Sequence, residues 1–143
     1  MNPKKIKIGC ASAFWGDTSS AARQLVEKGD IDYLVSDFLA EMTMSILAGS
    51  KKNNPKMGYA TDFIDQLSPL LETIKSKKIK VISNAGGVNL NSCKEALEKI
   101  AHTLGLALNI ATIAGDDLMS KKNELMGLNI KEMETDEELP DNL

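Results

Sequence analysis

The chain has 143 residues, 43% of them hydrophobic and 26% charged, which fits one globular domain with a sizeable core. Its net charge of −3 disfavours nucleic acid as a partner, because a phosphate backbone needs a basic surface. Two cysteines are too few for a disulfide framework, and no secretory signal or apolar run of about 20 residues is visible. We therefore expect a cytoplasmic protein with no membrane or nucleic-acid partner.

The hydrophobic pattern alternates between strands and helices. Strands are predicted at residues 5–10, 31–35, 79–82 and 106–114. Helices are predicted near residues 21–28, 38–51, 62–77, 91–104 and 118–126, with a kink or restart at Ser68-Pro69 and with Met42 and Ile46 in the apolar stripe of the second helix. Alternating strands and helices imply parallel crossovers. The prediction is an α/β fold with a parallel sheet of about four strands and helices on both faces, a three-layer Rossmann- or flavodoxin-like arrangement.

One domain is predicted over residues 1–126. The remaining residues, 127–143, form an acidic segment, with six carboxylates and one lysine from position 131 onward. Few apolar residues are present there to anchor the chain, so we expect a flexible, solvated tail.

Ligands of parallel α/β sheets bind at the carboxyl ends of the strands, where the clearest signal is residues 84–89. Asn84, Gly86, Gly87 and Asn89 follow a predicted strand and precede a helix, so their backbone amides can face an anion or a carbonyl oxygen. The alternative is a tight turn with asparagine caps, and the two interpretations are compatible.

Carboxylates supply the candidate acid–base groups. Asp116 and Asp117 follow the fourth predicted strand, and one of them is expected to cap the next helix while the other stays free for a proton, a hydroxyl or a metal. Asp37 and Glu41 are one helical turn apart, a spacing that suits paired acid and base. The pattern favours the simpler alternative for this pair, a solvated helix face with Asp37 at the N-cap.

The loop after the first strand adds Ser12, Trp15 and Asp17 as candidate ligand contacts. Trp15 either covers a ligand or closes the edge of the sheet, and the sequence leaves both open. Cys10 is expected to be a buried structural thiol rather than a nucleophile. The only histidine, His102, lies within a helix far from any strand end and is expected at the surface or in helix packing, which disfavours a Ser-His-Asp triad.

Taken together, these loops resemble the acyclic terpene utilisation family, a family of domains of unknown function, over residues 5 to about 118. The matching segments, in family order, are residues 8–17, residues 32–35 with 38–41 and Thr43, residues 58–60 with 62–63, residues 83–87 with Asn89, and residues 115–118. The resemblance is to the N-terminal portion of longer family members. Because the family is associated with degradation of branched terpenoid acids as coenzyme A thioesters, the resemblance implies a lyase- or hydratase-like step.

Two functions are compatible with this sequence. One is a catabolic enzyme, or part of one, acting on a small carboxylate or acyl thioester, with Asp116, Asp117 and Glu41 as acid–base or metal-binding groups. The other is a non-catalytic module that docks to a partner chain. No lysine or arginine directly follows a strand, so a homo-oligomer or a partner chain is expected to complete the site. No cofactor is identified, and a divalent metal is left open.

Overall fold

The computed structural model describes residues 5–138 and residue 140, which fall into two compact units. The first unit ends at Thr112 and the second begins at Ile113. In the part of the chain that is described, no helix has the length and apolar character needed to cross a membrane.

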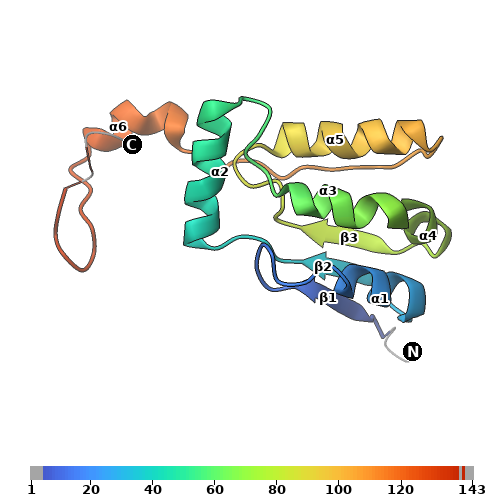
Figure 1. Cartoon of the computed structure of the whole chain (residues 1–143). Helices are drawn as coiled ribbons and strands as arrows, with labels where there is room; N and C mark the ends of the chain where they lie inside the picture. The colour runs from blue at the N-terminus through green and yellow to red at the C-terminus, as the bar shows by residue number, and fades with distance from the viewer. Residues whose placement is uncertain (1–4, 139, 141–143) are drawn as a thin grey trace. The chain divides into compact units, whose positions relative to one another are not determined.

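The first unit is built on a parallel sheet of three strands, in the order β1 (Ile8–Ser12), β2 (Tyr33–Ser36) and β3 (Lys80–Ser83) (Figure 1). The register places Ile8, Tyr33 and Lys80 in one row across the sheet. The next row of the same face holds the side chains of Cys10, Val35 and Ile82. The α/β class and the parallel pairing are therefore confirmed.

The helices of this unit fill the connections between the strands. They are α1 (Ala21–Lys28), α2 (Glu41–Asn53), α3 (Thr61–Leu67), the 3-10 turn η1 (Ser68–Leu70), α4 (Leu71–Ser76) and α5 (Leu90–Thr103). The restart predicted at Ser68-Pro69 is confirmed, because η1 separates α3 from α4 with proline in its first turn. Asn89 caps α5, since its side chain accepts a hydrogen bond from the Ser92 amide.

The hydrophobic core lies on one face of the sheet. It joins residues of β1 and β2 to α1, α3, α4 and α5, and its members include Ala11, Leu34, Val26, Phe63, Leu67, Ile74 and Leu97. The prediction of helices on both faces is wrong for the first unit, because the opposite-facing Ile8 and Ile82 stay 66% and 55% exposed. The β1-to-β2 and β2-to-β3 crossovers run in the same direction along the sheet. Because such crossovers are right-handed, their helices lie on the same face.

The fourth predicted strand is also wrong. Residues 106–112 are extended, and the side chains of Leu106, Leu108 and Ile110 pack against the core, but the described sheet has three strands and this segment belongs to none of them. The alternating pattern that predicted a strand is satisfied by side-chain packing alone. Alternation reports which side chains are buried, and it does not report whether the backbone finds a pairing partner.

The second predicted helix begins later than its pattern suggested. Phe38 is almost fully buried and contacts Phe63 edge to face, but it precedes α2, which begins at Glu41. With Phe38 outside the helix, α2 buries Thr43 and Leu47 instead. The predicted apolar stripe is therefore wrong at Met42 and Ile46, which are 76% and 54% exposed.

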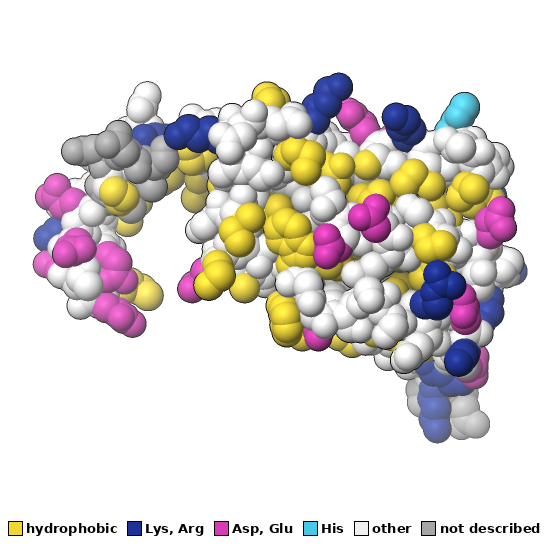
Figure 2. All heavy atoms as spheres, in the orientation of Figure 1, with side chains coloured by type: hydrophobic (Ala, Val, Ile, Leu, Met, Phe, Trp, Pro, Cys, Tyr) yellow, Lys and Arg dark blue, Asp and Glu magenta, His cyan; other side chains and the backbone are white. Residues whose placement is uncertain are grey.

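The second unit contains a 3-10 turn, η2 (Met119–Lys121), and a short helix, α6 (Lys122–Met126). The predicted end of the folded domain at residue 126 stays a prediction. Further on, Lys131 and Glu138 form an isolated antiparallel bridge. Figure 2 shows Asp and Glu side chains gathered on this C-terminal segment. Its mobility stays a prediction.

The two cysteines lie in opposite environments. Cys93 of α5 is buried in the core, and burial raises the pKa of its thiol to about 11 from an ordinary value of 9.0. Cys10 is exposed on the open face of the sheet, so the expectation of a buried structural thiol at this position is wrong. Its side chain alternates away from the core, on the face that no helix of the first unit covers.

The raised pKa of Cys93 predicts a loss of stability in alkali. The folded state disfavours the thiolate, so this contribution is complete below pH 9.0 and is lost as the pH rises through about 11. Denaturant unfolding at several pH values should show wild type losing stability relative to Cys93→Ala across this window. Subtracting the variant removes the titration of the shared lysines, and what remains includes the part of the raised pKa of Tyr59 that comes from the charge of Cys93. A constant difference across the window would contradict the prediction.

Candidate functional site

Three strand ends are joined by hydrogen bonds at the carboxyl edge of the sheet. The Ser12 hydroxyl at the end of β1 donates to the Asp37 carbonyl (2.9 Å), and the Asp37 amide donates back to the Ser12 carbonyl (3.1 Å). Asn84, directly after β3, accepts from the Phe38 amide through Oδ1 (2.8 Å) and donates to Asp37 Oδ1 through Nδ2 (2.8 Å). The loops after β1, β2 and β3 are thus held together at Asp37.

The carboxylate of Asp37 is held at this edge by two hydrogen bonds. Its Oδ1 accepts from the Leu39 amide (3.1 Å) as well as from Asn84, while its side chain stays exposed to solvent. The N-cap interpretation of Asp37 is wrong, because α2 begins at Glu41 and its N-cap is Ala40. The spacing pattern named Asp37 only as one of a carboxylate pair. Its place directly after a strand is the signal that indicates a position at the carboxyl edge of the sheet.

Glu41 lies in the first turn of α2 and is exposed. Among the described residues, no hydrogen bond or ion pair joins its side chain to Asp37. Asp37 and Glu41 are not one helical turn apart on a single helix, because α2 begins at Glu41.

The glycine loop after β3 is a tight turn whose amides are largely used within the protein. Ala85 N donates to Ser83 Oγ (3.0 Å), Gly87 N to the Asn84 carbonyl (3.1 Å), and Val88 N to the Gly58 carbonyl (3.0 Å). The Asn89 amide donates to the Gly86 carbonyl (2.9 Å). These contacts support the turn interpretation, and they leave the proposed anion cradle few amide donors.

The same loop is fastened to the segment that follows α2. Asn89 Nδ2 donates to the carbonyls of Pro55 (2.9 Å) and Met57 (2.7 Å), and Lys51 Nζ donates to the Val88 carbonyl (2.6 Å). Lys51 therefore brings a positive charge beside the glycine loop, from a helix rather than from a strand end. No local pattern in the sequence indicates this contact, since Lys51 and Val88 are 37 residues apart.

The loop after β1 is stabilised by its own aspartate. Asp17 accepts from the Ala13 amide (3.0 Å), and its own amide donates to the Phe14 carbonyl (3.2 Å). Trp15 is half-buried and packs against the core, while Phe14 is 52% exposed. The packing of Trp15 supports a structural role for its ring in closing the core.

Asp116 and Asp117 belong to the second unit, and the strand from which their position was predicted is not formed. Asp117 Oδ1 accepts from the Met119 amide (3.0 Å), a contact within the turn before η2. The N-cap of η2 is Leu118, so the capping role expected for one of the pair is wrong for this element. The side chain of Asp116 is exposed. That these carboxylates share an edge with Asn84 and Gly86 stays a prediction.

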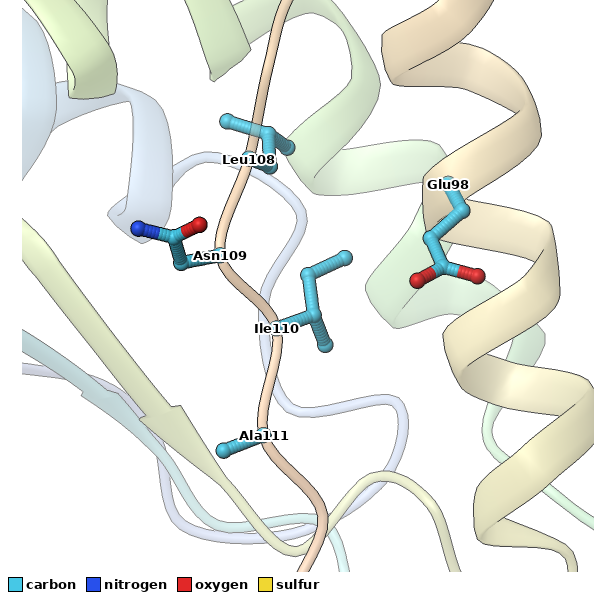
Figure 3. Close-up of a pocket in the computed structure, with 5 residues that line it drawn as sticks. All are labelled: Glu98, Leu108, Asn109, Ile110 and Ala111. Carbon is cyan, nitrogen blue, oxygen red and sulfur yellow. The ribbon is translucent and has the colours of Figure 1, made fainter.

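A hollow of about 330 Å³ lies between α5 and the extended segment that follows it (Figure 3). It is lined by Glu98 of α5 and by Leu108, Asn109, Ile110 and Ala111 of the extended segment. None of the predicted site residues lines it. Within the described residues, no group of three His, Cys, Asp or Glu side chains is arranged to hold a metal, and His102 is exposed near the end of α5.

The close packing of the glycine loop predicts that Gly87→Ala destabilises the fold. Gly87 has φ +52°, and an added Cβ would lie 2.5 Å from Leu47 Cδ1 and 2.8 Å from the Gly58 carbonyl oxygen. The free energy of unfolding should fall by about 1–3 kcal/mol, measured with denaturant. The control is Gly49→Ala in α2, where nothing lies within 4 Å and a gain of about 0.5–1 kcal/mol is expected. Equal stability of the two variants would contradict the packing role.

A comparison with protein families matches residues 6–143 to the family described as acyclic terpene utilisation family protein AtuA. The match continues beyond residue 118, where the recognised motifs end, and includes the acidic C-terminal segment. Comparisons with curated proteins and with solved structures found no match. Because the family match spans nearly the whole chain, the chain belongs to the acyclic terpene utilisation family AtuA.

Proposed function

We propose that this chain is part of a catabolic enzyme with a lyase- or hydratase-like activity on a small carboxylate or acyl coenzyme A thioester. Membership of the acyclic terpene utilisation family supports the substrate class. The observation that carries the reaction type is the exposed Asp37 carboxylate, fixed at the carboxyl edge of the sheet by the Leu39 amide and the Asn84 side chain. This edge is where parallel α/β sheets bind their ligands.

The hydrogen bonds of Asp37 give its two oxygens different tasks. Both fixed donors contact Oδ1, which orients the carboxylate and leaves Oδ2 to accept a proton. In a hydration, Oδ2 would take a proton from the attacking water. In the reverse elimination, it would return that proton to the departing hydroxyl group. Asn84 and Ser12 act as positioning residues, because their side chains form hydrogen bonds that hold the Asp37 segment.

The remaining candidates have supporting tasks in this proposal. Glu41 is exposed in the first turn of α2 and is the second carboxylate available as an acid. Lys51 is held beside the glycine loop, where its charge would favour an anionic substrate. Asp116 stays a candidate for the same site, and a divalent metal stays open.

The test is the variant Asp37→Asn, which keeps the shape of the side chain and removes its basicity. Turnover of a panel of branched acyl coenzyme A thioesters should fall about 100-fold or more. Binding, measured as a thermal shift with the same thioesters, should be largely retained. The control is Asp65→Asn on the exposed side of α3, which should keep the wild-type rate.

Three outcomes would overturn the proposal. One is wild-type protein that neither binds nor converts any thioester or free acid of the panel. Another is Asp37→Asn with an unchanged rate. The third is Asp65→Asn losing as much activity as Asp37→Asn, because the loss would then not be specific to the sheet edge.

A further inference from the structure

The sheet presents one apolar face that no helix of the first unit covers. Ile8 and Cys10 of β1, Val35 of β2 and Ile82 of β3 alternate away from the core and lie in adjacent rows. Ile8 and Ile82 are both more than half exposed, while Val35 at the centre is half-buried. Aliphatic side chains aligned across three strands form the kind of surface that sheets bury against another layer.

Charges lie at opposite ends of this face. Lys80 is at the amino end of β3, with its Nζ 5.5 Å from the centre of the Tyr33 ring. At the carboxyl end, Asp37 and Asn84 directly follow β2 and β3, and both are exposed. A cation therefore lies at one end of the aliphatic centre and a carboxylate at the edge beyond its other end.

We propose that a second copy of this chain packs on the open face, with its strands antiparallel to those of the first. The two-fold axis lies between the sheets, perpendicular to the strands and level with the row of Cys10, Val35 and Ile82. This axis stacks each strand on its own copy, so that Ile82 faces the partner's Ile82. A two-fold axis along the strands and over β2 would instead bring Asp37, directly after β2, opposite the partner's Asp37, and like charges disfavour that arrangement.

The antiparallel arrangement brings the partner's Lys80 to the carboxyl edge that holds Asp37. Face-to-face sheets lie about 10 Å apart, and an extended lysine side chain reaches across most of that gap. No lysine directly follows a strand in this chain, so the second copy would supply a cation that the strand ends lack. The dimer itself does not depend on the proposed reaction, and its test needs no substrate.

The size of the face predicts a weak dimer. Three strands spaced about 4.8 Å apart and about four residues long cover on the order of 200 Å² of flat sheet. Stable interfaces bury about 800 Å² of accessible surface from each partner, so association should depend on concentration in the micromolar range.

The first test is sedimentation velocity from low micromolar to several hundred micromolar protein. Wild type should shift toward the dimer as concentration rises, and Ile82→Glu should stay monomeric. The matched control is Ile46→Glu on α2, where the isoleucine is 54% exposed against 55% for Ile82. Ile46→Glu should associate as wild type does. A wild-type monomer throughout the range, or equal loss in both variants, would overturn the proposal.

The second test addresses the orientation and does not alter the aliphatic centre. Lys80→Glu should weaken association at least several-fold, and the double variant Lys80→Glu with Asp37→Lys should restore it. Melting curves confirm that each variant is folded. Failure of the double variant to recover association would overturn the antiparallel arrangement.

The third test uses the two cysteines. A flexible bis-maleimide with a spacer of about 10 Å should link Cys10 to the partner's Cys10, because both lie on the level of the proposed axis. Cys10→Ser should abolish the covalent dimer. Cys93→Ser should not, since Cys93 is buried in the core. Crosslinking that persists in Cys10→Ser would place the contact elsewhere and overturn the proposal.

Discussion

The direction of the two crossovers determines the layout of the first unit. The chain passes from β1 to the adjacent β2 and then to the adjacent β3, in the same direction across the sheet, and both connections contain helices. Right-handed crossovers that step in one direction place their helices on one face. The core residues of α1, α3 and α4 therefore gather on that face, while the aliphatic residues of the opposite face stay exposed.

The carboxyl edge of the sheet follows from the same arrangement. Parallel strands end at one edge, so the residues directly after β1, β2 and β3 can contact one another although they are distant in the chain. Asn84 reaches Phe38 and Asp37 across 46 and 47 residues, respectively, and uses both ends of its amide to do so. A carboxylate held by such contacts has a defined orientation, which is the requirement for a general base.

The glycines of the chain illustrate how a ligand-binding pattern and a packing pattern overlap. Gly86 and Gly87 suggested a cradle for an anion, but the space beside each is filled by Leu90 and Leu47, respectively. The close approach that glycine permits is used here by side chains of α2 and α5 and by the Gly58 carbonyl. Lys51 brings a positive charge beside this turn, and the shape of the turn follows from packing.

The sequence by itself determined the local elements of this protein. Alternation and helical period located β1, β2, β3 and α5 within a few residues, the Ser68-Pro69 pair predicted the restart of the helix, and the loop motifs indicated the family. These features depend on neighbours in the chain, which a sequence displays. Tertiary structure alone decided that residues 106–112 pack against the core without joining the sheet, and that Cys10 faces outward. It also decided that Asp37 is held at the carboxyl edge of the sheet by Asn84 and is not part of a helical pair with Glu41. Each of these outcomes depends on which partner the backbone or side chain finds across the fold, and that partner lies tens of residues away.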